Sequence, residues 1–186
     1  MSKQMAVKRM VMNAVMVAVY VVLSLPFMVI SVGGLKVTFE HFPVVLCAVL
    51  FGPIDAMLVG GIGELINQLT SFGLTPTTLL WILPIVVRGL VVGLCGKCFK
   101  KGMSRQAIIH NKVSLTFWII CIISGIFSSL FNTLALYVDS KLFGYYTFAL
   151  VFGALAVRLL LSAVTSVVIA LAIKPILHAL KHESFI

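Results

Sequence analysis

Residues 42–70 read FPVVLCAVLFGPIDAMLVGGIGELINQLT, an almost entirely apolar stretch that is interrupted near its middle by Phe51-Gly52-Pro53. As one helix its 29 residues would extend about 44 Å, well beyond the roughly 30 Å hydrocarbon core of a bilayer. Proline lacks a backbone N–H and clashes with the preceding turn, so Gly-Pro is a helix-breaking signal. The stretch therefore predicts either one kinked span or two short spans, about 42–51 and 53–70, joined by a tight turn.

The composition of the whole chain indicates that its solvent is largely lipid. Of the 186 residues, 61% are hydrophobic and only 10% are charged, whereas soluble domains carry about 25% charged residues. Apolar runs of about 17–25 residues are long enough to cross a bilayer. Besides the stretch above, such runs cover about 10–30, 77–99, 113–138 and 145–173. We interpret residues 1–186 as one integral membrane domain.

The distribution of basic residues separates the two interpretations of 42–70. The net charge of +9 comes from 14 Lys and Arg against 5 Asp and Glu, and we attribute it to membrane topology rather than to nucleic-acid binding. With two spans in 42–70, one side of the membrane holds ten basic residues and the other holds two, Lys36 and Lys141. Because basic residues collect on cytoplasmic loops, we predict an all-α membrane protein of six transmembrane helices with N- and C-termini cytoplasmic.

Three ionisable residues lie inside the predicted spans, namely Glu64, Arg88 and Arg158. Each lies near the middle of the membrane, where an ionisable group is costly and is therefore a functional candidate. One interpretation is a buried ion pair between Glu64 and one arginine that locks helices together. The other is a ligand site, because two arginines against one carboxylate leave a positive charge unpaired. A guanidinium binds a carboxylate in a two-pronged geometry, so an anionic or carbonyl-rich ligand would complete the group.

Polar and aromatic residues near the outer ends of the spans add candidate ligand contacts. Aromatic rings and amide groups can sandwich and orient a small organic molecule. For Trp81 and the tyrosines, the alternative is the aromatic belt at the membrane interface. Lys36, Glu40 and His41 adjoin the first outer loop, where they either gate a pocket or are ordinary loop residues. The remaining candidates are Asn67, Gln68, Asn132, Tyr137, Tyr145 and Tyr146.

Small residues four apart mark faces on which helices make close contact. Ala14 and Ala18 form such a face in the first span, and residues 52–60 repeat the spacing in the third span on the face that leads to Glu64. Spacing alone allows either packing within this chain or docking onto another membrane subunit.

Enzymatic chemistry finds little support in the sequence. The chain has only five acids, its four histidines are scattered, and no Ser-His-Asp or metal-ligand cluster can be assembled. Cys95 and Cys98 have C-x-x-C spacing, but no second pair is present to complete a zinc site. No Gly-rich phosphate loop for a built-in ATPase occurs. We therefore expect no catalytic residue, no metal and no cofactor.

The pattern resembles one known family, the S components, or substrate-binding subunits, of energy-coupling factor (ECF) vitamin transporters. The motif Ala14-x-x-x-Ala18 on the first helix is one feature that carries the resemblance. A second is Leu50-Phe51-Gly52-Pro53 at the end of a short second helix, which is typical of the folate and pantothenate branches. The third is the long outer loop over residues 31–41. The resemblance covers nearly the whole chain.

The resemblance implies a multi-pass protein of the plasma membrane that binds a vitamin tightly from outside. It implies docking through Ala14 and Ala18 onto a transmembrane coupling protein, followed by toppling driven by two partner ATPase subunits. The excess of buried positive charge favours a carboxylate-bearing vitamin, such as folate or pantothenate, over cationic thiamine. Two other hypotheses remain: an autonomous small secondary transporter, although no internal repeat is visible, and a membrane enzyme or envelope scaffold protein.

Overall fold

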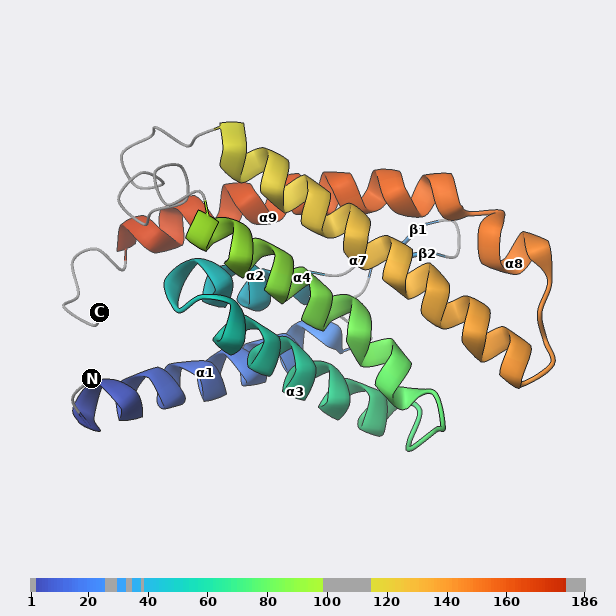
Figure 1. The fold of residues 1–186 in the computed structure, drawn as a ribbon, viewed down its shortest axis with the longest axis horizontal. Coiled ribbons are helices and arrows are strands. Elements are labelled where there is room, and N and C mark those ends of the chain that lie inside the picture. Colours follow the sequence, from blue (N-terminus) through green and yellow to red (C-terminus); the bar gives the residue numbers. More distant parts are fainter. Residues whose placement is uncertain (1–2, 26–29, 33–34, 38, 99–114, 180–186) are drawn as a thin grey trace.

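The computed structural model describes residues 3–25, 30–32, 35–37, 39–98 and 115–179. Within these ranges the chain is helical except for a small antiparallel hairpin, in which Ser31 lies opposite Lys36. In chain order the elements are α1 (Lys3–Ser24), β1 (Ile30–Val32), β2 (Leu35–Val37), α2 (His41–Leu50), α3 (Pro53–Ser71), α4 (Thr78–Cys98), α7 (Leu115–Leu142), α8 (Phe148–Phe152) and α9 (Leu155–Ala179) (Figure 1). The predicted helical architecture is confirmed, whereas the hairpin was not predicted.

Four segments among the described residues are long and apolar enough to cross a membrane. They are Ala6–Ser24, Thr78–Gly96, Leu115–Leu142 and Phe148–Ile173. The helix α2 is apolar but has only 10 residues, and α3 has 19 residues that include Asp55 and Glu64. Six crossings and the cytoplasmic location of both termini therefore stay predictions.

The apolar stretch 42–70 forms two helices rather than one. Gly52 separates them with a φ of 98°, a backbone conformation that favours glycine because side chains with a Cβ rarely adopt it. Pro53 then occupies the start of α3, where the missing N–H has no helical partner to lose. At the end of α2, the Phe51 N–H donates to the Cys47 carbonyl at 2.8 Å. The Gly-Pro pair is thus a turn between two helices.

Small residues bring α3 close to α2 and α4. A Cβ added to Gly89 of α4 would lie 3.0 Å from the carbonyl carbon of Ala56, and a Cβ on Gly60 would lie 3.0 Å from the Ile85 side chain. Such contacts let the helix backbones approach each other. The stripe over residues 52–60 therefore packs inside this chain.

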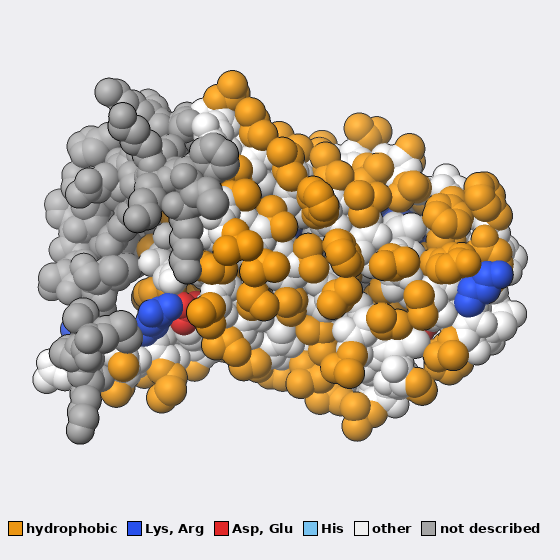
Figure 2. Space-filling model, in the orientation of Figure 1, with side chains coloured by type: hydrophobic (Ala, Val, Ile, Leu, Met, Phe, Trp, Pro, Cys, Tyr) orange, Lys and Arg blue, Asp and Glu red, His pale blue; other side chains and the backbone are white. Residues whose placement is uncertain are grey.

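The helix α1 packs along α2 and α3 and leaves its other side exposed. Ala14 and Ala18 lie on that exposed side. In Figure 1, α1 begins at the end of the bundle where α9 ends. In Figure 2, apolar side chains cover the middle of the molecule, and most of the Lys and Arg side chains visible on this face lie toward the two ends of its long axis. An apolar surface this broad is typical of a chain surrounded by lipid.

Candidate ligand-binding site

A cavity of about 930 Å³ opens between α1, α3, α4, α7 and α9. Its lining includes Ser24 at the end of α1, Ser71 at the end of α3 and Thr77 just before α4. The cavity therefore lies toward the end of the bundle opposite to the one where α1 begins. Its volume falls within the roughly 300–1,000 Å³ that is usual for small-molecule sites.

Each long helix contributes one face to the cavity wall. On a helix, residues three and four apart lie on the same side, and the lining residues follow this spacing. The faces are Glu64, Asn67, Gln68 and Ser71 on α3; Trp81, Ile85 and Arg88 on α4; Ser128, Asn132, Leu136 and Asp139 on α7; and Arg158, Leu161, Ser162 and Thr165 on α9. The recurrence of polar residues at this spacing in otherwise apolar helices is a signal that the sequence already contains.

Arg88 from the middle of α4 is among the largest fully buried side chains of the described residues, with 1% of its surface exposed. Its Nη2 donates to the Ser166 hydroxyl of α9 at 2.8 Å. Its Nε has no hydrogen-bond partner, and no ion pair to a carboxylate is found for it in the described part of the chain. A buried guanidinium that is only partly satisfied is costly, so Arg88 stays a candidate for binding an acceptor from outside the protein.

Two further residues have an unpaired buried nitrogen. The Arg158 Nη1 is unpaired, and its Nη2 makes only a 3.4 Å contact with the Leu150 carbonyl. The Nδ1 of His41, at the start of α2, is also unpaired. Among the described residues, His41, Arg88 and Arg158 are the three with a buried side-chain nitrogen or oxygen that lacks a partner, and all three line the cavity. The three residues with unpaired groups thus line the same cavity.

Glu64 does not pair with either arginine among the described residues. Its Oε2 accepts from the Tyr20 hydroxyl at 2.7 Å and from Asn67 Nδ2 at 3.1 Å, and its Oε1 accepts from Gln68 Nε2 at 2.6 Å. The ion pair considered from the sequence is therefore not observed. Asn67 and Gln68 follow from helical spacing, whereas the Tyr20 contact depends on how α1 packs against α3.

The sequence missed a second carboxylate in the cavity wall. Asp139, near the end of α7, accepts hydrogen bonds from the hydroxyls of Thr77 and Tyr145. Glu40 lines the cavity too, so three acids accompany the two arginines and the cavity as a whole has no excess of positive charge. Asp139 lies just beyond the predicted span 113–138, where an acidic residue is usually part of a loop. What the cavity offers to an anionic group is therefore unpaired donors and not an excess of positive charge.

Some of the other predicted ligand contacts line the cavity, and others do not. Trp81 and Asn132 line the cavity. Tyr137 is not among the lining residues, and its ring instead packs edge-on against Tyr146 with 5.5 Å between centroids. Its expected role in sandwiching a ligand is therefore not supported by its position. The side chain of Lys36 lies outside the described residues.

Residues with a hydroxyl group form the largest class of lining residues that was not predicted from the sequence. They come from four helices and from the segment between α3 and α4. They are Tyr20, Ser24, Ser71, Thr75, Thr77, Ser128, Ser129, Ser162 and Thr165. Ser and Thr are common in membrane helices because they bond to the backbone of their own helix, so their presence alone did not indicate a site.

Comparison with known proteins identifies the family. The family model described as ECF transporter, substrate-specific component matches residues 8–179. A solved structure, titled as the S component of a bacterial ECF transporter, superposes with a TM-score of 0.68 at 20% sequence identity, over 94% of this chain and 98% of that chain. No curated protein matches the sequence significantly. The chain therefore belongs to the substrate-specific components of ECF transporters, membrane-embedded transport subunits that bind small molecules and work with an ECF module.

Proposed function

We propose that this protein captures a carboxylate-bearing vitamin, such as folate or pantothenate, with high affinity from outside the cell. In this proposal it is the substrate-specific subunit of an ECF-type ABC importer in the plasma membrane. The observation that supports it most is that the unpaired buried nitrogens of His41, Arg88 and Arg158 all belong to the wall of one cavity.

The chemistry of the cavity favours an anionic group on the ligand. Guanidinium groups donate to carboxylates with good geometry, and Arg88 and Arg158 have donors to spare. The carboxylates of Glu64 and Asp139 already accept hydrogen bonds from protein groups. Trp81 supplies an aromatic surface for the rest of the molecule. Folate and pantothenate both offer a carboxylate, and the volume of about 930 Å³ admits either.

We further propose six crossings with both termini in the cytoplasm, so that the cavity opens outward. The separation of α2 from α3 at Gly52 and the common end at which α1 begins and α9 ends support an even number of crossings. The strong bias of basic residues to one side supports the orientation.

Transport requires an energy source, which the proposal assigns to a transmembrane coupling protein and two ATPase subunits. Ala14 and Ala18 are both exposed on α1, and small residues at this spacing allow close approach of another helix. We propose this face as the docking surface for the coupling protein.

Titration of the purified protein tests the proposed ligand class. Folate and pantothenate are added separately to the detergent-solubilised protein in a calorimeter, with cationic thiamine as the comparison. We expect either folate or pantothenate to bind with a Kd below about 1 μM, which corresponds to a binding free energy of about −8 kcal/mol. Thiamine should bind at least a hundredfold more weakly. Preferential binding of thiamine would contradict the proposal.

A further inference from the structure

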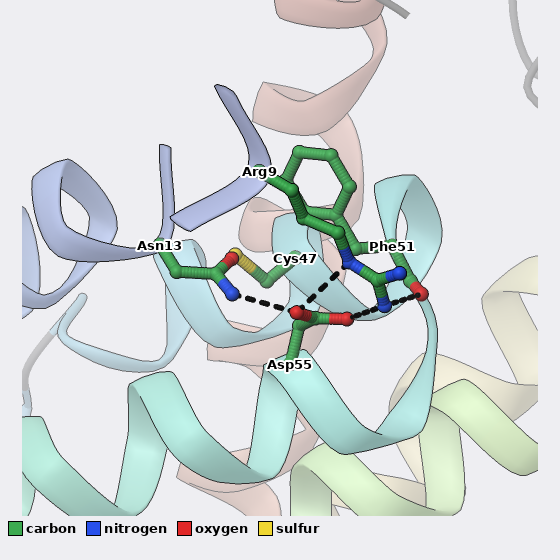
Figure 3. Close-up of polar contacts among 5 residues, drawn as sticks. All are labelled: Arg9, Asn13, Cys47, Phe51 and Asp55. Atoms are coloured by element: carbon green, nitrogen blue, oxygen red, sulfur yellow. Dashed lines mark hydrogen bonds and ion pairs between the residues drawn. The ribbon is translucent and has the colours of Figure 1, made fainter. Parts of the chain in front are cut away.

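A group of polar side chains outside the cavity joins α1 to the junction of α2 and α3. Arg9 Nε donates to Asp55 Oδ1 at 3.0 Å, and Arg9 Nη2 donates both to Asp55 Oδ2 and, at 3.1 Å, to the Phe51 carbonyl. Asn13 Nδ2 donates to Asp55 Oδ1 at 2.6 Å. Figure 3 shows the Arg9 and Asn13 side chains of α1 converging on the Asp55 carboxylate. We call Arg9, Asn13, Phe51 and Asp55 the inner clasp.

The inner clasp places a favourable charge at each of the two helix ends that meet at the Gly-Pro turn. Phe51 caps the C-terminus of α2, where a cation is favourable, and Asp55 lies in the first turn of α3, where an anion is favourable. Asp55 is buried, with 6% of its surface exposed. Arg9 and Asp55 form an ion pair. Without Arg9 the buried carboxylate would keep only Asn13 as a side-chain partner, which is an unfavourable arrangement.

A second polar contact joins the same two helices next to the cavity. Tyr20 of α1 and Glu64 of α3 are both buried, and the hydroxyl donates to the carboxylate at 2.7 Å. A Cβ on Gly63 would lie 2.5 Å from the Tyr20 ring, so glycine is required for this approach. We call Tyr20 and Glu64 the outer clasp. Glu64 follows Asp55 by nine positions, or about 14 Å along α3.

The two clasps lie on one side of α1, and the exposed alanines lie on the other. Successive residues of a helix are rotated by about 100°. Relative to Arg9, Asn13 and Tyr20 are therefore rotated by about 40° and 20°, whereas Ala14 and Ala18 are rotated by about 140° and 180°. The exposure of both alanines agrees with this arrangement.

We propose that the inner and outer clasps together fix the rotation of α1 about its axis and so hold the Ala14–Ala18 face toward the coupling protein. Arg9 and Asp55 are then positioning residues for docking, and they do not contact the ligand, because neither lines the cavity. This inference rests on the proposed function for the identity of the partner.

Co-purification with the coupling protein and its ATPases tests the inference in six variants. Arg9→Met, which keeps the apolar stem, and Asp55→Asn should each lower the complex recovered by at least fivefold while folate and pantothenate titrations stay within twofold of the unaltered protein. Arg9→Lys, which keeps the charge, should retain more than half of the complex. The double variant Arg9→Asp with Asp55→Arg should recover more complex than either single change of charge. Full recovery in Arg9→Met, or no gain in the double variant, would overturn the inference.

A second measurement needs no partner and so separates this inference from the proposed function. Nitroxide labels are placed at Ala14→Cys or Val17→Cys in a background without the native cysteines, and their contact with lipid-dissolved oxygen is measured by spin resonance. Val17 packs against the buried core, so its label should be the less accessible one. In Arg9→Met, the difference in oxygen accessibility between the labels at positions 14 and 17 should be at least twofold smaller. An unchanged difference would refute the clasp, whereas absence of any complex with the unaltered protein would refute only the proposed partner.

Discussion

Arg88 and Arg158 carry more hydrogen-bond donors than the described residues satisfy, and this imbalance is the central feature at the scale of single residues. Both were identifiable from the sequence, because an arginine within an apolar span is rare and costly. Asp139 was not, because it lies at the end of its apolar run. The contact of Tyr20 with Glu64 joins residues 44 apart, so no local pattern indicated it.

Replacing either cavity arginine should weaken ligand binding. Arg88→Met and Arg158→Met keep much of the apolar stem but remove the donors, and each should raise the Kd for the bound vitamin more than tenfold, or about 1.4 kcal/mol. Calorimetric titration measures the change. Arg9→Met is the matched control, because Arg9 lies outside the cavity, and its Kd should stay within twofold. Unchanged affinity in both cavity variants would refute the assignment.

Gly63 should tolerate a side chain less well than its neighbour Gly61. An added Cβ at Gly63 would lie 2.5 Å from the Tyr20 ring, whereas at Gly61 it would be 3.4 Å from Val86, an ordinary contact. Gly63→Ala should therefore destabilise the fold by about 1–3 kcal/mol, and Gly61→Ala should be neutral or slightly stabilising because alanine favours helix. Thermal unfolding in detergent measures both, and equal melting temperatures would contradict the close packing of α1 on α3.

At the scale of elements, the decisive feature is the Gly-Pro turn that divides 42–70 into α2 and α3. From the sequence, Gly-Pro indicated either one kinked span or two short spans, and the bias of basic residues to one side then favoured two. Local signals were weaker elsewhere. The predicted span over 145–173 corresponds to two helices, α8 and α9, and α7 continues to Leu142 through polar residues that end an apolar run without ending a helix.

The exposed face of α1 should be sensitive to added bulk without affecting the ligand. Ala14→Leu combined with Ala18→Leu should lower co-purification with the coupling protein more than tenfold, because large side chains prevent close approach of two helices. Ligand affinity and melting temperature should change little, since both alanines are exposed. Val164→Leu, which adds bulk at an exposed position of α9 instead of α1, is the control. Normal complex formation by the double variant would exclude this face as the docking surface.

At the scale of the whole molecule, composition and charge distribution were sufficient to predict a helical membrane protein. Both quantities are sums over the whole chain, so a misinterpreted single residue changes the conclusion little. The cavity is different, because its wall is assembled from residues of six helices whose mutual rotation is set by packing. The likeness to a solved S component at 20% identity supports the fold and leaves the ligand to be determined by experiment.

The topology can be tested directly on whole cells. Tags on the N- and C-terminus should both be inaccessible to an impermeant reagent until the cells are opened, because six crossings place both ends in the cytoplasm. A cysteine introduced at Phe143, an exposed residue of the cavity wall, should react from outside and serves as the control. Tags on opposite sides of the membrane would show an odd number of crossings.

The most direct test of the central claim is native mass spectrometry of the purified protein, which identifies a small molecule that remains bound through purification. We predict a vitamin that carries a carboxylate, present in the unaltered protein and in Arg9→Met but lost from Arg88→Met and Arg158→Met. A bound molecule without an anionic group, or a carboxylate retained equally by both cavity variants, would contradict the claim that the unpaired arginine donors hold the ligand.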